Sequence, residues 1–314
     1  MPETMIELRR LRRYFGHTKA VDGVSFEVQR GQVFGFIGPN GAGKTTSMRI
    51  LATLDCPQSG DAFVDGFSVT EDPDRVRRRL GFMPDYYGTY PNMNVLEYLD
   101  FFARSYGLRG DDRRRGIHYV LDFTGLDKLQ EKAVSGLSKG MKQRLCLGRT
   151  MIHNPPVLVL DEPAAGLDPR ARIELREMIR RLAADGKTIL VSSHILTELA
   201  EMCDTVGIIE QGRILAVGSV EEIHRRAGAR QQSWVRLRVL GGAEGASQWL
   251  SARGDVHEMK LDGEMLTFAH DGDKNSEADL LRDFISAGFR VVAFGSHERS
   301  LEDVFMQVTA GLVQ

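Results

Sequence analysis

The stretch "VFGFIGPNGAGKTTSMRIL", residues 33–51, decides the fold of this chain. Its first residues are mostly apolar and are typical of a short buried strand, and the residues from Lys44 onward have the apolar spacing of a helix. The glycine-rich loop between them fits the pattern G-x-x-x-x-G-K-[ST]. Strand, glycine loop and helix in this order predict a loop that binds the phosphates of a nucleoside triphosphate.

The residue types in this loop each have a physical role. The glycines let the backbone curl, so that successive N–H groups point inward at phosphate oxygens. Lys44 is expected to reach the β- and γ-phosphates, the Thr45 hydroxyl can ligate Mg²⁺, and the helix start adds the positive end of its dipole. The predicted nucleotide contacts in the loop are Gly38, Asn40, Gly41, Gly43, Lys44, Thr45 and Thr46.

Acidic and basic side chains follow two further buried strands. In "VLVLDEP", residues 157–163, the strand delivers Asp161 to the carboxyl end of the sheet, where it can hold Mg²⁺ through water. Glu162 is expected to point to the opposite side, toward the γ-phosphate, as general base for the attacking water. His194 follows "TILVSS" and is predicted to contact the γ-phosphate, which makes Lys44, Glu162 and His194 the catalytic candidates.

A second anion site is indicated at "LSKGMKQR", residues 137–144. Ser138 stands at the N-cap position of a predicted helix, Gly140 follows, and Lys and Arg lie nearby. A helix start with a free hydroxyl and flexible backbone N–H groups is a natural anion site. One nucleotide would then have two phosphate-binding segments that lie far apart in the sequence, the glycine loop and this helix start, which we call the two cradles.

Composition and charge narrow the functional classes. The chain has 314 residues, a hydrophobic fraction of 42% and a formal net charge of −2. This length suits a large domain plus a smaller one, and the charge gives no general attraction to nucleic acid or anionic membrane. Cys56, Cys146 and Cys203 fit no metal or disulfide pattern, so reduced cytoplasmic thiols are expected. With no signal peptide and no apolar run of ~20 residues, we expect a protein that is soluble by itself and meets a membrane only through a partner.

Buried strands alternate with helices over most of the chain, which predicts an α/β fold with a mostly parallel sheet. Alternating patterns near the N-terminus predict two antiparallel edge strands, and Gln211–Gly212 is predicted as the turn of a hairpin. We expect a first domain at 1–230, with a helical part at about 86–150, and a small α+β domain at 231–314 with a ferredoxin-like element order. Further helices are predicted at 195–204, 219–229 and 301–310.

Together these motifs resemble the ATP-binding subunits of ABC transporters over residues 5–218. The motifs that carry the resemblance stand in the family's order: the phosphate loop at 38–46, "LSKGM" at 137–141, "VLVLDE" at 157–162, "GLDP" at 166–169 and His194. The resemblance implies a P-loop NTPase fold with an ABC-type antiparallel edge sheet and a helical subdomain. It also implies ATP and Mg²⁺ as cofactors and ATP hydrolysis coupled to transport.

The resemblance explains the two cradles. It implies two nucleotide-binding domains arranged head to tail, so that Ser138 and Gly140 serve the γ-phosphate of the partner's ATP. Asp168 would lie at the dimer seam, and Phe15 matches the aromatic residue that stacks on adenine, with Tyr14 as the fallback. ATP would hold the pair together, and hydrolysis would let it open. A homodimer is expected, and a heterodimer stays open.

Two positions depart from the family pattern. Lys139 stands where the family usually has glycine; it either touches phosphate or faces solvent, and solvent is favoured. Asp85 stands where the family usually has a glutamine that contacts Mg²⁺ and the attacking water. A carboxylate there can still contact Mg²⁺, directly or through water. The predicted metal-site residues are therefore Thr45, Asp85 and Asp161.

The resemblance implies the motor subunit of a transporter on the cytoplasmic face of the cell membrane, whose permease is a separate chain. Residues 86–102 would form the groove for a cytoplasmic helix of that permease, which would also select the cargo. Residues 298–310 look like the tail of drug, lipid or polysaccharide exporters, so export is favoured over import. No nucleic acid partner is expected. Two alternatives are a soluble ABC ATPase acting on ribosomes or DNA, and a sensor whose small domain binds a ligand.

Overall fold

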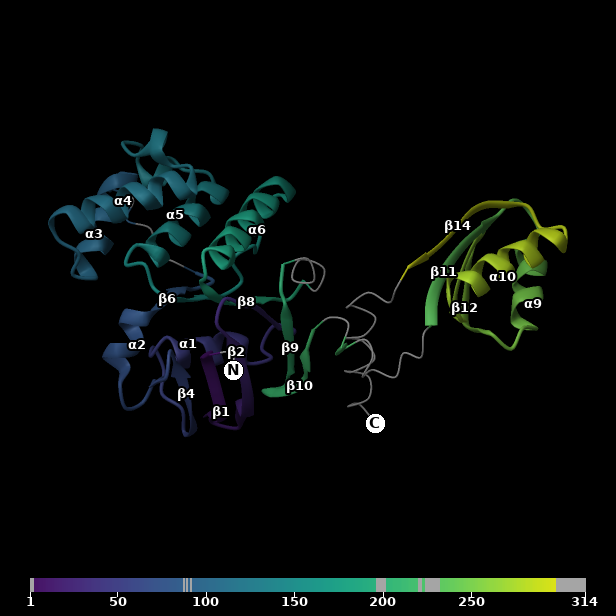
Figure 1. Ribbon diagram of the computed structural model, residues 1–314, viewed down its shortest axis with the longest axis horizontal. Helices are drawn as coiled ribbons and strands as arrows, with labels where there is room; N and C mark the ends of the chain where they lie inside the picture. Colours follow the sequence, from purple (N-terminus) through teal and green to yellow (C-terminus); the bar gives the residue numbers. More distant parts are fainter. Residues whose placement is uncertain are drawn as a thin grey trace. The chain divides into compact units, whose positions relative to one another are not determined.

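The chain divides into two compact units between residues 220 and 221 (Figure 1). The computed structural model describes residues 3–86, 88, 90, 92–195, 202–219, 222–223 and 232–297. The domain boundary predicted at 230 lies outside these residues and stays a prediction. The helices predicted at 195–204, 219–229 and 301–310 lie wholly or mostly outside them, and so does the exporter-like stretch 298–310.

A six-stranded sheet lies at the centre of the first unit. Its strands are β3 (Val33–Ile37), β6 (Leu80–Met83), β7 (Val157–Leu160), β8 (Thr188–Ser193), β9 (Thr205–Glu210) and β10 (Arg213–Gly218). Their order is β10-β9-β3-β8-β7-β6, and all neighbours are parallel except β9 and β10. Every residue of β3, β7 and β8 is buried, as expected for parallel strands covered on both faces. The segments that follow β3, β6, β7 and β8 therefore meet at one edge of the sheet.

The hairpin between β9 and β10 turns at Gln211 and Gly212, as predicted from the sequence. Both residues have positive φ, 46° and 78°, which fits the tight turns that match the twist of antiparallel strands. The Gly212 N–H donates to the carbonyl of Ala42 at 2.9 Å, and the Gly212 carbonyl accepts from the Asp22 N–H at 2.7 Å. The turn therefore ties the glycine loop to an edge strand through backbone atoms.

A four-stranded antiparallel sheet lies beside the central sheet in the first unit (Figure 1). Its strands are β1 (Thr4–Phe15), β2 (Thr18–Gln29), β4 (Ser59–Val64) and β5 (Phe67–Ser68), in the order β2-β1-β4-β5. The alternating sequence pattern predicts β1 and β2 but not β4 and β5. Asp65 and Gly66, both with positive φ, form the turn between these two strands, and an Asp-Gly pair between apolar residues is a hairpin signal.

The helices of the first unit fall into two groups. Three of them, α3 (Val95–Ser105), α4 (Gly110–Thr124) and α5 (Lys139–Met151), contact one another and form a helical part set off from the edge sheet (Figure 1). The others are α1 (Lys44–Leu51), α2 (Pro73–Arg79) and α6 (Pro169–Ala184), with short 3₁₀ turns at Asp127–Leu129 and Val134–Gly136. None of the helices in the described part of the chain is long and apolar enough to span a membrane.

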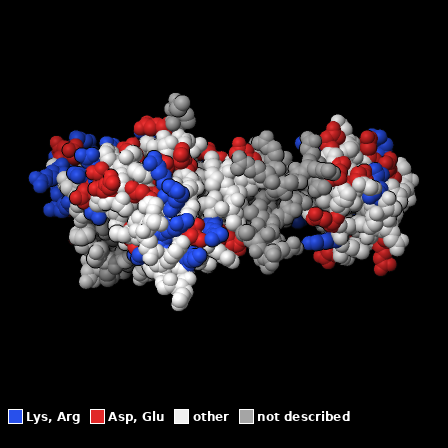
Figure 2. All heavy atoms as spheres, turned by 90° about the horizontal axis from the view of Figure 1, so that it is seen from below, with Lys and Arg blue, Asp and Glu red and all other residues white. Residues whose placement is uncertain are grey.

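The sequence contains three basic runs, "RRLRR" at 9–13, "RVRRR" at 75–79 and "RRR" at 113–115, and nearby acids pair with most of their arginines. Figure 2 shows basic and acidic side chains intermixed over one end of the first unit. The arginines of the three runs that form ion pairs with Asp or Glu are Arg9, Arg12, Arg13, Arg75, Arg77, Arg79, Arg113, Arg114 and Arg115. These runs are therefore solvated faces with balanced charge.

The second unit is a small antiparallel sheet with two helices. Its elements are β11 (Gln232–Val239), α9 (Ala243–Ser251), β12 (Val256–Asp262), β13 (Met265–Asp271), α10 (Lys274–Ser286) and β14 (Val291–His297). The strand order β12-β13-β11-β14 and the βαββαβ element order are those of a ferredoxin-like arrangement. The β12–β13 turn is at Gly263 and Glu264, and Gly263 has a positive φ of 59°.

Candidate functional site

The glycine loop between β3 and α1 is shaped by contacts that exclude side chains. A Cβ on Gly38 would lie 2.2 Å from the carbonyl oxygen of Ile209, and a Cβ on Gly43 would lie 2.2 Å from that of Ala20. Gly43 also has φ 109° and stands at the N-cap of α1. Gly41 has φ 82°, which glycine adopts most readily. The loop can therefore keep this curve only with glycine at these positions.

Lys44 is the buried cation of the loop. Lys44 is the first residue of α1, and it is only 5% exposed. The Nζ ammonium donates to the carbonyl of Gly38 at 2.6 Å and of Pro39 at 3.2 Å, and lies 3.3 Å from Oε1 of Glu162. Of the other predicted loop contacts, Asn40, Gly41 and Thr45 are exposed and Thr46 is half-buried. The loop thus holds the Lys44 ammonium beneath residues that solvent can reach.

Asp161 follows β7 and is fully buried. Its N–H donates to the carbonyl of Met83 at 2.8 Å, and its Oδ1 accepts from the Ser192 hydroxyl at 2.6 Å. Burial raises the pKa of this carboxyl, while the nearby hydroxyls of Ser192 and Thr45 oppose the rise. Its other oxygen, Oδ2, is buried and has no hydrogen-bond partner among the described residues. A cation at Oδ2 would favour the ionised carboxylate.

Glu162 adopts a backbone conformation that is uncommon for a residue with a side chain, with φ 47°. Its N–H donates to the Ser192 Oγ at 2.9 Å. Its carboxylate lies between two partners: Oε1 is the atom near Lys44, and Oε2 accepts from Nδ1–H of His194 at 2.8 Å. This tautomer leaves Nε2 of His194 for another partner. The three predicted catalytic residues therefore form one contiguous group.

The residues predicted to hold Mg²⁺ lie around one cavity. Thr45, Asp85 and Asp161 all line a surface cavity of about 440 Å³. Asp85 is exposed, and its Oδ1 accepts from the N–H of Tyr86 at 2.7 Å. The described residues contain no cluster of three or more His, Cys, Asp or Glu side chains that could hold a metal by themselves. Mg²⁺ usually binds through one or two carboxylates plus substrate phosphates, so a hydroxyl and these two acids fit it.

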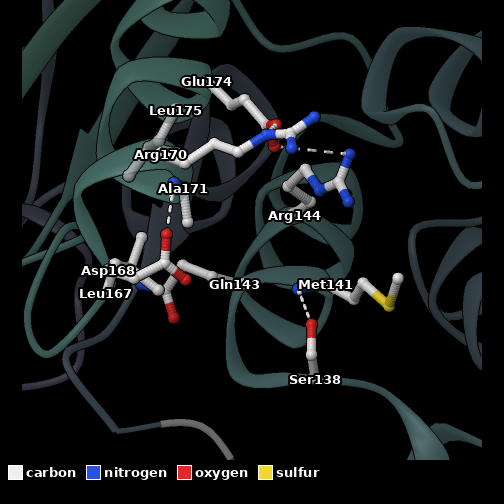
Figure 3. A pocket seen from close by; sticks show the side chains of 11 residues that line it. Ser138, Met141, Gln143, Arg144, Leu167, Asp168, Arg170, Ala171, Glu174 and Leu175 are labelled. Atoms are coloured by element: carbon white, nitrogen blue, oxygen red, sulfur yellow. Dashed lines mark hydrogen bonds and ion pairs between the residues drawn. The ribbon is translucent and has the colours of Figure 1, made fainter.

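The stretch "LSKGM" at 137–141, called the signature below, lies at a different cavity, of about 130 Å³, between the starts of α5 and α6 (Figure 3). Ser138 caps α5 by accepting from the N–H of Met141 at 3.3 Å, as predicted. Asp168 caps α6 by accepting from the N–H of Ala171 at 2.9 Å. Gly140 also lines this cavity. Among the described residues, none lines both this cavity and the one around Asp161.

Lys139 is exposed, in agreement with the favoured interpretation. Its side chain turns toward the loop before α6, since a Cβ on Gly166 would lie 2.1 Å from its Nζ. Gly166 has φ 66°, so the loop conformation favours glycine there. Lys139 therefore lies against its own chain.

Phe15 suits adenine stacking better than Tyr14 does. Phe15 is 49% exposed, and the Arg13 guanidinium lies 4.6 Å from its ring centroid. The Tyr14 hydroxyl is engaged, since it donates to Oδ1 of Asp22 at 2.6 Å. A stacking partner needs a free ring face, and Phe15 has more exposed surface.

Two buried polar residues of the site were missed in the sequence analysis. Ser192 contacts both acids, and the Gln143 side chain donates from Nε2 to the carbonyl of Pro163, directly after Glu162. The available signal was a polar residue within a buried strand or helix face. That signal marks a residue as a candidate for the site but does not show which group it hydrogen-bonds.

Known proteins share both the sequence and the fold. Residues 21–165 match the family described as ABC transporter, and residues 218–309 match the ATP-binding protein DrrA1-3-like C-terminal domain. The Nod factor export ATP-binding protein I of Ralstonia nicotianae is 39% identical over 219 residues, which are 70% of this chain and 68% of that protein. The linearmycin resistance ATP-binding protein LnrL of Bacillus subtilis is 29% identical over 310 residues, 97% and 98% of the two chains.

Solved structures give the same assignment. The structure of an ATP-binding subunit of an ABC transporter superposes with a TM-score of 0.66 and 31% identity, covering 72% of this chain and 94% of that one. A dimeric bacterial ABC transporter cassette superposes with a TM-score of 0.62 and 25% identity, covering 69% and 99%. The predicted fold class, a P-loop NTPase with an ABC-type edge sheet and helical part, is confirmed. The chain therefore belongs to the family of ABC transporter ATP-binding subunits, and it is the subunit that binds and hydrolyses ATP to drive a transporter.

Proposed function

We propose that this chain works as a homodimer with Mg²⁺-ATP, attached to the cytoplasmic face of the cell membrane through a separate permease, and that it powers export. The observation that carries the dimer is the separation of the two cradles. Ser138 and Gly140 line a cavity that shares no described residue with the one around Thr45 and Asp161. One chain does not close both cradles around one nucleotide, whereas two chains placed head to tail can do so.

In this proposal each side chain of the hydrolysis site has one role. Lys44 binds the β- and γ-phosphates from beneath the loop, where its ammonium is already buried. Glu162 takes a proton from the attacking water, and His194 holds its carboxylate through the 2.8 Å hydrogen bond. Mg²⁺, bound by Thr45, Asp161 and Asp85, would offset the negative charge on the phosphates. Phe15 stacks on adenine.

The comparisons support export. The two relatives named above are described as a Nod factor export protein and a linearmycin resistance protein. The similarity to the second extends over almost the whole of both chains, including the small unit. We therefore assign this chain to an export system and place the choice of cargo in the permease.

A groove beside the hydrolysis site suits a permease helix. The cavity around Asp161 is also lined by Leu54, Phe102 and Tyr106, and Leu54 and Tyr106 are exposed. Arg49 and Arg77 line it as well, which gives the apolar floor a basic rim. A helix with an apolar face and an acidic residue would match this groove. Because Asp85 lies in the same cavity, such a helix would rest close to the hydrolysis site.

Mixing two inactive variants tests the dimer. Lys44→Ala disables the phosphate loop and Ser138→Ala disables the signature, and each is expected to be nearly inactive alone. A mixed dimer keeps one intact composite site only if the signature serves the partner's nucleotide. Since about half of the dimers in an equal mixture are mixed, ATPase activity should recover to at most about a quarter of the unmodified level. Activity equal to the average of the two separate variants would contradict the proposal.

The matched control is Ser135→Ala, which removes an exposed serine outside the signature cavity. Ser135→Ala should leave ATPase activity unchanged. An equal mixture of Ser135→Ala with Lys44→Ala should show only the loss of activity expected from diluting active chains with inactive ones. The permease is tested separately, by purifying the tagged chain from detergent-solubilised cells and identifying the co-purifying proteins by mass. A multi-span membrane protein in stoichiometric amount supports the proposal, whereas ribosomal, DNA-bound or solely water-soluble partners contradict it.

A further inference from the structure

Ser192 makes two hydrogen bonds to the acids of the hydrolysis site. It lies near the end of β8, between apolar residues and Ser193, and it is fully buried. Its hydroxyl donates to Oδ1 of Asp161 at 2.6 Å and accepts from the N–H of Glu162 at 2.9 Å. A serine hydroxyl has one proton to donate, and here that proton is used on Asp161. One side chain thus contacts two consecutive residues on the neighbouring strand end.

The first bond fixes the direction of the Asp161 carboxylate. With Oδ1 held by Ser192 and the backbone N–H held by Met83, the carboxylate cannot rotate without losing a buried hydrogen bond. The oxygen that remains without a partner among the described residues is Oδ2. The serine therefore determines which oxygen is presented to a metal ion.

The second bond fixes the turn of Glu162. The positive φ of Glu162 is unfavourable for any residue other than glycine, so neighbouring groups must stabilise this backbone conformation. The Ser192 Oγ accepts the N–H of Glu162 in this conformation. The same conformation places the carboxylate between Lys44 and His194.

We propose that Ser192 is a positioning residue for ATP hydrolysis, and that its single hydroxyl aligns Asp161 for the metal and Glu162 for the attacking water. The inference rests on the proposed Mg²⁺ site. Ser192 touches neither substrate nor metal in this role and acts through the two acids. Partners of this kind behind metal ligands commonly change metal affinity or activity by 10–100-fold when they are removed.

The neighbouring serine provides a matched control. Ser193 is nearly as buried as Ser192, but its Oγ accepts from the N–H of Ile195 at 2.9 Å and contacts neither acid in the described structure. Ser192→Ala and Ser193→Ala therefore remove the same atom from adjacent positions of one strand. Ser192→Thr keeps the hydroxyl and tests rescue.

The experiment measures binding of a non-hydrolysable ATP analogue to the full chain, first in chelator and then with Mg²⁺, together with steady-state ATPase kinetics. For Ser192→Ala we expect analogue affinity in chelator within about twofold of the unmodified chain. The gain in affinity on adding Mg²⁺ should fall ~10–100-fold, and kcat should fall at least ~10-fold. Ser193→Ala should match the unmodified chain in both, and Ser192→Thr should recover most of the Mg²⁺ effect.

The outcomes separate the inference from the proposed metal site. If Mg²⁺ strengthens binding to the unmodified chain and to Ser192→Ala equally, the role of Ser192 is refuted and the metal site stands. If Mg²⁺ has no effect on the unmodified chain, the metal site itself fails. If Ser192→Ala weakens analogue binding equally with and without Mg²⁺, or if Ser193→Ala behaves in the same way, the serine has only a structural role and the inference is overturned.

Discussion

Acid should destabilise the ATPase unit through His153, which follows α5. Its ring stacks on Tyr106 with centroids 3.7 Å apart and planes inclined by 9°, and its Nε2–H donates to the carbonyl of Leu80 at 3.3 Å. Burial lowers the pKa of His153 from 6.5 to about 4. The imidazole therefore joins the helical part to β6 in its neutral form.

The size of the effect follows from the two pKa values. Between pH 6.5 and about 4 the unfolded chain binds a proton at this residue and the folded chain does not. Stability is therefore complete above the unfolded pKa and is lost as the pH falls. Each pH unit in this range costs about 1.4 kcal/mol, so the loss at pH 5 is about 2 kcal/mol and the full loss about 3 kcal/mol.

The assay compares urea unfolding of the unmodified chain and His153→Phe at pH 7.5 and pH 5. Phenylalanine keeps a ring against Tyr106 but cannot take a proton, so its pH-dependent loss should be smaller by about 2 kcal/mol. Circular dichroism follows both units. Fluorescence follows the second unit alone, because both tryptophans, Trp234 and Trp249, lie there.

His118→Phe is the matched control, because it removes an exposed histidine from α4. Its pH-dependent loss should equal that of the unmodified chain. The same loss for His153→Phe as for the unmodified chain would refute the reasoning. Other groups that titrate in this range contribute equally to both proteins and cancel in the comparison.

Three further predictions concern the hydrolysis site. Glu162→Gln should bind ATP but turn over ~10²–10⁴-fold more slowly, as measured by single-turnover hydrolysis; unchanged turnover would remove Glu162 from the mechanism. Asp85→Gln should keep ATPase activity, because an acceptor oxygen there matters more than charge, and a steady-state loss as large as that of Glu162→Gln would contradict this. Gly43→Ala should abolish ATP binding in a nucleotide titration, because its Cβ would lie 2.2 Å from a carbonyl oxygen; Gly23→Ala, with positive φ but open space, should bind ATP normally.

The fold was predictable wherever one local pattern sufficed. The glycine loop, the buried parallel strands β3, β7 and β8, and the β9–β10 turn each carry a strong signal in a few consecutive residues. The strands β4 and β5, the helix α2 and the strand β6 were not assigned. These elements are short, and β4 mixes polar with apolar residues. Their existence depends on the strands beside them more than on their own composition.

The site was predictable in its residues and less so in its contacts. The order of motifs indicated Lys44, Asp161, Glu162 and His194, and the structure brings these four together. Ser192 could not be assigned a role from the sequence, because its partners lie on a strand end some thirty residues away in the chain. Hydrogen bonds across a sheet depend on register, which a local pattern does not encode.

The bracing of the glycine loop by the β9–β10 turn has an evolutionary consequence. The bonds that link Ala42, Gly212 and Asp22 use main-chain atoms alone. Many different side chains can therefore occupy the neighbouring surface without disturbing the nucleotide cradle. Substitution is restricted at the glycines whose Cβ would meet another backbone and at the loop residues that contact the nucleotide. The main-chain bonds between these segments can persist when exposed side chains around them change.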